Sequence, residues 1–162
     1  VTVDTLRMPD GKEALRETVI RGKNAAAVLP LDADGKFIFV RQYRHAFQEM
    51  LLEIPAGILE DGEAPEVGAK RELAEETGKL AQELTFICEL YPTVGYCTEK
   101  ICLYFAQNLT DCVQCLDADE FVEIERYTPE EALEMIQKGE IKDAKTVAAI
   151  FSFFAYSSRQ KV

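Results

Sequence analysis

Residues 57–79 read GILEDGEAPEVGAKRELAEETGK and carry the strongest structural signals in this chain of 162 residues. Pro65 suits the first turn of a helix, and Gly78 suits the position directly after its last turn. The residues before Pro65 are rich in glycine and acidic side chains, which favour a turn. The stretch therefore predicts a loop, a helix from about Pro65 to Thr77, and a second loop.

Three glutamates of the expected helix share one of its faces. Glu72, Glu75 and Glu76 stand at positions i, i+3 and i+4, so their carboxylates should converge. Like charges at this spacing destabilise a helix by roughly a few tenths of a kcal/mol per pair, so the cluster needs open solvent or a cation. Oxygen ligands select magnesium or manganese, and Gly68, one turn earlier, would leave room for a metal-bound phosphate. The alternative interpretation is a solvated acidic face.

A longer pattern around these glutamates favours the metal platform. Its form is G-x5-E-x7-R-E-U-x-E-E-x-G, where U is apolar, and chance would produce it on the order of 10⁻⁵ times in such a chain. Its fixed positions are Gly57, Glu63, Arg71, Glu72, Leu73, Glu75, Glu76 and Gly78. The pattern resembles the Nudix box. Lys79 stands where that family usually has an apolar residue, and its aliphatic stem could pack in the same way.

The resemblance implies an α/β fold, the Nudix α/β/α sandwich, with a mixed sheet between the box helix and the C-terminal helices. It also implies a hydrolase that depends on magnesium, with manganese as the alternative ion. The metal ligands that it implies are Glu72, Glu75, Glu76 and the backbone carbonyl of Ala56. The structural residues that it implies are Gly57, Gly78 and the pair formed by Glu63 and Arg71.

The flanking segments resemble the ADP-ribose pyrophosphatase branch of the family. They are RQYRHAF, LEIPAG, YPTVGYCTEKICLYFA and DEFVEIERYTPEEALEMI. This resemblance implies cleavage of the diphosphate of a nucleoside diphosphate sugar, with ADP-ribose giving AMP and ribose 5-phosphate. GDP-mannose and FAD are alternative substrates. A Nudix module that senses a nucleotide sugar without cleaving it is an alternative function.

Candidate substrate-binding residues precede the box. Arg44 matches an arginine that contacts the diphosphate in related enzymes, although a surface arginine paired with a carboxylate explains it equally well. Arg21 is a second candidate for the same task. The chain has no tryptophan, so Tyr43, Phe47 or a residue of the N-terminal hairpin would supply an aromatic platform for adenine.

The general base is expected downstream of the box. In the resembling branch it is usually a glutamate in a loop between the last strands, and Glu120 in LDADEFVEI matches it. Glu123 is the second candidate, and an acidic loop without a chemical role is the alternative interpretation. Of the box residues, Glu75 and Glu76 are included among the catalytic candidates, because the base belongs to the box helix if neither loop glutamate serves.

The N-terminus is expected to form a separate element. Residues 1–22 contain the turn signal PDGK between two mixed runs, which predicts a β-hairpin. Two strands alone are marginally stable. Because the resemblance implies a homodimer that shares residues between active sites, the hairpin is a candidate dimerisation element. Residues 23–162 would then form the hydrolase domain.

Local patterns place the remaining elements. Strands are expected at 24–31, 36–44, 50–54, 84–91, 100–109 and 121–127. The turn signal Asp34-Gly35 should join the first two strands as a hairpin. Thr128 and Glu131 form a capping box for a helix that ends before Gly139, and an apolar helix follows Asp143.

Composition restricts the partners. The net charge is −11, which disfavours nucleic acid and so an RNA-end pyrophosphohydrolase, whereas metal ions could bridge acidic residues to a small diphosphate. No apolar stretch approaches the ~20 residues that span a bilayer. Five cysteines without zinc-ligand spacing favour a reducing, cytoplasmic compartment, with a redox or metal role for Cys112 and Cys115 as the minority reading.

Overall fold

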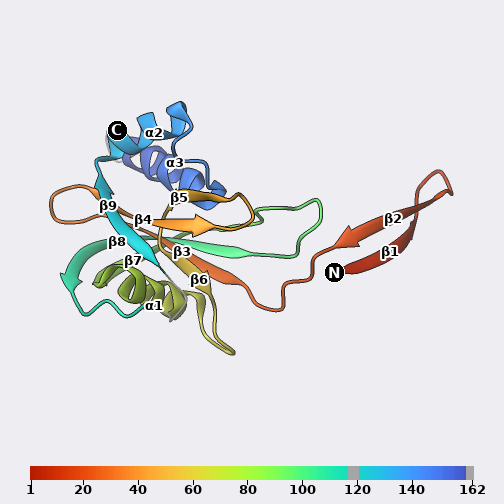
Figure 1. Cartoon of the computed structure of the whole chain (residues 1–162), viewed down its shortest axis with the longest axis horizontal. Coiled ribbons are helices and arrows are strands. Elements are labelled where there is room, and N and C mark those ends of the chain that lie inside the picture. The colour runs from red at the N-terminus through yellow and green to blue at the C-terminus, as the bar shows by residue number, and fades with distance from the viewer. Residues whose placement is uncertain (117–120, 160–162) are drawn as a thin grey trace.

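The computed structural model describes residues 1–116 and 121–159, which contain nine strands and three helices (Figure 1). The strands are β1 (Thr2–Arg7), β2 (Glu13–Thr18), β3 (Ala25–Pro30), β4 (Phe37–Arg44), β5 (Glu49–Glu53), β6 (Ala56–Ile58), β7 (Lys79–Leu90), β8 (Ile101–Asp111) and β9 (Val122–Tyr127). The helices are α1 (Pro65–Thr77), α2 (Pro129–Lys138) and α3 (Ala144–Arg159).

The body of the molecule is an α/β/α sandwich around two sheets. The four-stranded sheet has the order β6-β3-β8-β7 and is mixed, because β3 and β8 are parallel and the other pairs are antiparallel. The three-stranded sheet has the order β5-β4-β9 and is antiparallel. Helix α1 covers one side of these strands, and α2 and α3 cover the other (Figure 1).

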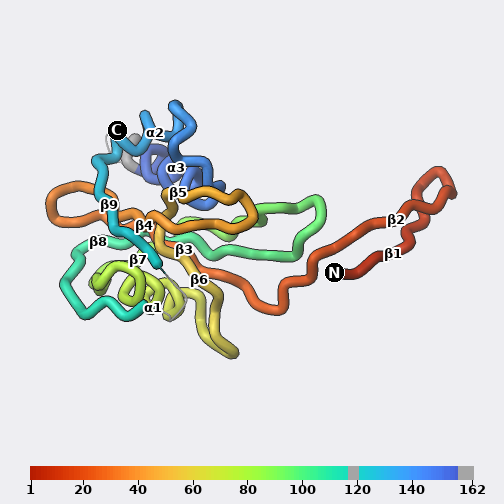
Figure 2. Tube along the Cα trace, in the orientation of Figure 1, coloured from red at the N-terminus to blue at the C-terminus, as the bar shows by residue number. Residues whose placement is uncertain are grey.

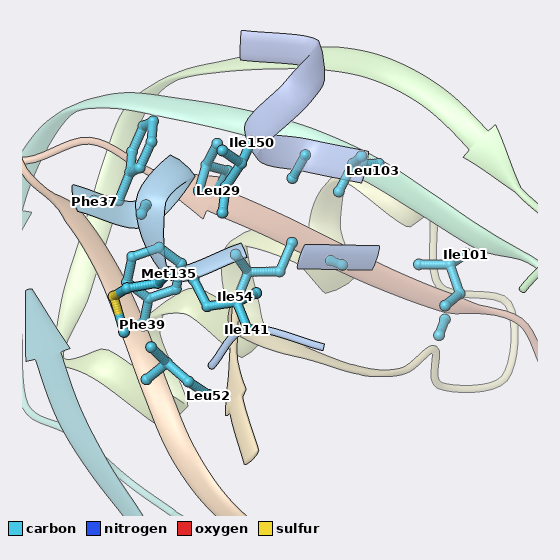
Figure 3. Close-up of a cluster of buried hydrophobic side chains, with 14 residues drawn as sticks. Leu29, Phe37, Phe39, Leu52, Ile54, Ile101, Leu103, Met135, Ile141 and Ile150 are labelled. Carbon is cyan, nitrogen blue, oxygen red and sulfur yellow. The ribbon is translucent and has the colours of Figure 1, made fainter. Parts of the chain in front are cut away.

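Strand β3 lies at the centre and is buried along its whole length. Its side chains alternate between the two layers of core. Ala27 and Leu29 belong to the cluster beneath α2 and α3, whereas Ala26 and Val28 belong to the cluster beneath α1. The first cluster also contains Phe37, Phe39, Met135 and Ile150 (Figure 3). The expected fold is confirmed.

The three helices begin where the local signals predict, and α1 and α2 also end there. Pro65 starts α1, and Gly78 follows it with a left-handed φ of 65°. Thr128 Oγ1 accepts a hydrogen bond from Glu131 N at 3.2 Å, and Glu131 Oε2 accepts one from Thr128 N at 2.8 Å, so the capping box of α2 is present. Asp143 accepts a bond from the backbone N of Thr146 at 3.0 Å and so caps α3.

The prediction of a hairpin between 24–31 and 36–44 is wrong. The turn itself forms, and Gly35 adopts the left-handed φ of 74° that it requires. However, only one isolated bridge joins the two segments, between Leu31 and Phe37. The edges of β3 are already occupied by β6 and β8, and those of β4 by β5 and β9, so the chain passes from one sheet into the other.

The N-terminal hairpin is present and projects from the body (Figures 1 and 2). Strands β1 and β2 pair from Thr2 opposite Thr18 to Arg7 opposite Glu13. Every residue of β1 is exposed, and the side chains that face solvent include Val3 and Leu15. The two strands therefore lack a packing surface within this chain. None of the described helices is both long and apolar enough to cross a membrane.

Candidate active site

Strand β6 approaches α1 so closely that Gly57 has no room for a side chain. A Cβ atom at Gly57 would lie 2.1 Å from Oε1 of Glu72. Gly68 is also tightly packed, but its neighbour is Leu59, whose Cδ2 would lie 2.3 Å from an added Cβ. The expectation that Gly68 leaves space for a phosphate is therefore wrong, because the side chain of Leu59 and the carboxylate of Glu63 fill that space.

Arg71 is the organising residue of this wall of the site. Its Nε and Nη2 donate to the two carboxylate oxygens of Glu63 at 2.9 and 3.0 Å, so the expected pair is present. Its Nη1 donates to Glu72 Oε1 at 2.7 Å and to Glu75 Oε2 at 2.8 Å. These bonds, led by that to Glu63, raise the pKa of Arg71 and lower the pKa of Glu63. One guanidinium therefore holds three carboxylates.

The three box glutamates differ in their surroundings. Glu72 and Glu76 are buried, and Glu75 is half-buried. Glu76 Oε2 accepts a hydrogen bond from the backbone N of Ala56 at 3.2 Å. This bond places Ala56, whose carbonyl is an expected metal ligand, beside the helix. In the described ranges, no three His, Cys, Asp or Glu residues stand ready to chelate an ion. Arg71 explains this arrangement in part, because its Nη1 bridges Glu72 and Glu75.

A cationic wall faces the box helix. Arg44, at the end of β4, donates from Nε and Nη2 to the two oxygens of Glu53 at 2.6 and 2.9 Å. Glu53 also accepts a hydrogen bond from Lys145 Nζ, and Lys145 lies 3.0 Å from Asp143 Oδ2. The bond to Glu53 raises the pKa of Arg44. The sequence interpretation did not include Glu53, Asp143 or Lys145.

Both walls border one cavity of about 750 Å³, which lies in the size range of ligand pockets. Its acidic lining residues include Glu53, Glu72, Glu75, Glu76 and Asp143, and its basic ones include Arg21, Lys23, Arg44, Arg71 and Lys145. Ala56 and Gly57 also line it, so the cavity brings together the implied metal ligands and both candidate arginines.

Of the two aromatic residues considered as platforms for adenine, one lines the cavity and the other does not. Phe47, in the turn between β4 and β5, lines the cavity. Tyr43 is exposed and does not line it, because side chains alternate along a strand and those of Gln42 and Arg44 are the ones that face the cavity. Arg21 lines the cavity near Glu99, whose Oε1 lies 3.8 Å from Arg21 Nε.

The first candidate base, Glu120, lies outside the described residues. Glu123 is exposed in β9, pairs in register with Arg41, and does not line the cavity. Residues 114 and 115 cover the carbonyl end of α1, since Cys115 N donates to Glu75 O at 3.1 Å and Gln114 Nε2 to Glu76 O at 2.6 Å. All five cysteines are free thiols.

A sandwich with an acidic loop–helix–loop and a facing cationic wall defines an α/β protein suited to an anionic ligand and a divalent ion. The family model of the NUDIX domain matches residues 21–150 of the chain. The chain belongs to the Nudix family.

Three curated relatives resemble the chain over most of its length. It is 41% identical over 150 residues to an ADP-ribose pyrophosphatase of Bacillus subtilis, and the match covers 91% of this chain and 80% of that protein. It is 39% identical to a methanol dehydrogenase activator of Bacillus methanolicus, with the same coverage. It is 36% identical to a GDP-mannose pyrophosphatase of Cronobacter sakazakii, over 82% of this chain and 73% of that protein.

A solved structure described as an ADP compounds hydrolase has the same fold. The TM-score is 0.88, and the match covers 98% of this chain and 85% of that one. Its sequence identity of 23% limits the similarity to the architecture.

Proposed function

We propose that this chain is a magnesium-dependent hydrolase of nucleoside diphosphate sugars, with ADP-ribose cleaved to AMP and ribose 5-phosphate. The observation that carries the proposal is that one cavity has both an acidic wall on α1 and a basic wall around Arg44. A diphosphate between them would meet cations directly and carboxylates through a metal ion. The 41% identity to an ADP-ribose pyrophosphatase supports this choice of substrate.

The donor set fits magnesium, with manganese as the alternative. Carboxylates from Glu72, Glu75 and Glu76 and the carbonyl of Ala56 are hard oxygen ligands on the rim of one cavity. A bound ion would neutralise the diphosphate oxygens and the charge on the departing phosphate. Arg71 keeps these carboxylates in place through its bonds to Glu72 and Glu75, while its two bonds to Glu63 hold it to the box loop.

The residues of this chain would bind and orient the substrate. Arg44 and Arg21 supply fixed positive charge for the diphosphate, and Phe47 supplies an aromatic face for the nucleobase. Tyr43 is the weaker platform, because it faces away from the cavity. Glu120 is the proposed base that accepts a proton from the attacking water, with Glu123 second and the box residues Glu75 and Glu76 as the remaining catalytic candidates.

A hydrolysis panel tests this function. Purified protein with magnesium would be given ADP-ribose, GDP-mannose, FAD, nucleoside triphosphates and capped RNA. The expected result is the highest kcat/KM with ADP-ribose. A higher value with GDP-mannose, which the 36% identical relatives name, would change the substrate and keep the chemistry. Absence of turnover with every compound would favour the sensing module.

We further propose that residues 1–22 are a dimerisation element attached to a hydrolase domain at 23–162. The exposed hairpin supports this proposal, because Val3 and Leu15 have no packing surface in one chain. A homodimer in the cytoplasm, with residues shared between active sites, is the expected assembly. Sedimentation at micromolar concentration should give a dimer, whereas a fully active monomer would contradict it.

A further inference from the structure

Glu53 is the most deeply buried acidic group of the basic wall, with an exposed fraction of only 2%. It ends β5 and accepts two hydrogen bonds from Arg44 and one from Lys145. Burial alone would raise the pKa of Glu53, but the bonds from Arg44 and Lys145 outweigh it, and the pKa lies below its ordinary value. The carboxylate is therefore ionised at neutral pH and holds two cations.

This network is a costly way to stabilise a fold. Each charge loses hydration on burial, and replacement of a buried ion pair by apolar residues is often neutral or stabilising. Lys145 adds a second cost, because it is buried in the first turn of α3, where the helix dipole disfavours a cation. Stability alone does not account for such charges, but their position on the wall of the cavity does.

The geometry of the Arg44–Glu53 pair leaves one edge of the guanidinium available. Glu53 takes Nε and Nη2, and within the described residues Nη1 of Arg44 makes no hydrogen bond. Arginine carries five N–H donors in a rigid fork, so fixing one edge also fixes the direction of the other. The Arg44 side chain is 40% exposed, whereas that of Glu53 is 3% exposed. A ligand in the cavity can therefore reach Arg44.

We propose that Glu53 is a positioning residue that aims Arg44 at the substrate diphosphate, and that Lys145 holds Glu53 in place. This inference rests on the proposed function, in which Arg44 binds the diphosphate. In this role Glu53 acts through Arg44. Its loss should weaken binding through Arg44, because a freed arginine side chain must give up rotational freedom when a phosphate binds.

A double-mutant cycle tests this role. Glu53→Gln, Arg44→Ala and the double variant would be compared by steady-state kinetics with ADP-ribose and by calorimetric binding of its non-hydrolysable α,β-methylene analogue. Glu53→Gln should raise KM and the dissociation constant by about 10- to 100-fold, with a smaller effect on kcat. In the Arg44→Ala background the same substitution should change either constant by less than about twofold.

Glu125→Gln is the matched control. Glu125 pairs with Arg41, which lies in β4 as Arg44 does, and this pair also uses Nε and Nη2 of the arginine. Neither Glu125 nor Arg41 lines the cavity. This variant should keep the KM of the wild type. An equal rise in KM for Glu125→Gln, or an undiminished effect of Glu53→Gln without Arg44, would overturn the positioning role.

Two further results separate the possible failures. If Glu53→Gln does not fold, Glu53→Asp keeps the charge and shortens its reach, and its KM should lie between those of the wild type and Arg44→Ala. An unchanged KM in Glu53→Asp would contradict the inference. Wild-type protein that hydrolyses no diphosphate in the panel would defeat the proposed function, whereas normal turnover with an unaffected Glu53→Gln variant would defeat only the inference.

Discussion

The two walls of the cavity organise charge in opposite ways. On α1, one arginine, Arg71, holds the carboxylates of Glu63, Glu72 and Glu75. Across the cavity, one glutamate, Glu53, holds two cations. Each wall therefore has a central residue that binds two or more groups of the opposite charge, and on the basic wall Asp143 also lies 3.0 Å from Lys145. This arrangement suits a diphosphate that needs cations on one side and metal ligands on the other.

The central residues differ in their access to solvent. The Arg71 side chain is 25% exposed, whereas that of Glu53 is 3% exposed. Partly solvated arginine can exchange partners at little cost, but a buried carboxylate that loses its partners remains uncompensated. We therefore expect Arg71 to be able to exchange carboxylate partners when an ion binds, and the pairings of Glu53 on the basic wall to stay fixed.

The largest expected effect concerns the proposed general base, Glu120. Glu120→Gln should lower kcat by about 10²–10⁴-fold with little change in KM, as for a positioned general base. Metal affinity should hardly change, because the proposed ligands are the carboxylates of α1 and the carbonyl of Ala56. Glu123→Gln provides the comparison in parallel kinetics. If only that variant loses activity, the base is three residues further along, and if neither does, the base belongs to the acidic wall itself.

A slightly smaller loss is expected on the acidic wall. Glu76→Gln should reduce kcat by about 10²–10³-fold and weaken manganese binding measured by electron paramagnetic resonance. The fold should survive, since a glutamine oxygen can still accept the bond from Ala56 N. Glu66→Gln on the exposed side of α1, where Glu66 pairs with Lys70, is the control. Normal manganese binding in Glu76→Gln would remove this residue from the ligand set.

Gly57→Ala tests the close approach that shapes the acidic wall. The added methyl group would overlap the carboxylate of Glu72, which must then move. Activity should fall by about 10- to 100-fold, as expected for misplaced catalytic groups. The melting temperature should change little, because only the end of a flexible side chain is displaced. Gly95→Ala, which meets no atom within 4 Å, should leave both quantities unchanged.

The acidic wall was predictable from sequence because its signals are local. The helix boundaries follow from Pro65 and Gly78, and helical geometry alone places Glu72, Glu75 and Glu76 on one face. The role of Gly68 was not predictable in the same way. Its neighbour Leu59 reaches it through the fold of the box loop, and spacing does not reveal which group fills a gap.

The basic wall was only partly predictable because the fold assembles it. Arg44 was identified by resemblance, but its partners were not, since Lys145 reaches Glu53 across 92 positions of the chain. A single acidic residue in the apolar run MLLEIP was the available signal. The separation of β3 and β4 into two sheets was hidden for the same reason, because a turn signal fixes the turn and not the partners of the strands.

Acid titration tests whether the basic wall is fixed. The pKa of Glu53 in the folded protein lies below its ordinary value of 4.5. Its contribution to stability is therefore complete above about pH 5 and is lost as the pH falls through the lowered pKa. Wild-type protein and Glu53→Gln should differ most in melting temperature near pH 7 and converge as the pH falls below 4.5. A gap that is independent of pH would contradict ionisation of Glu53.

The smallest effect should come from Thr128→Ala, which lies outside both walls. The substitution removes the side-chain cap of α2, so the free energy of unfolding should fall by about 1 kcal/mol in urea denaturation. Because Thr128 does not line the cavity, kcat and KM should remain those of the wild type. This variant therefore shows whether a loss of stability by itself lowers activity, which is the control that the wall variants need. A parallel loss of activity would mean that the cavity responds to general loosening of the fold, and the effects of the wall variants would then lose their electrostatic interpretation.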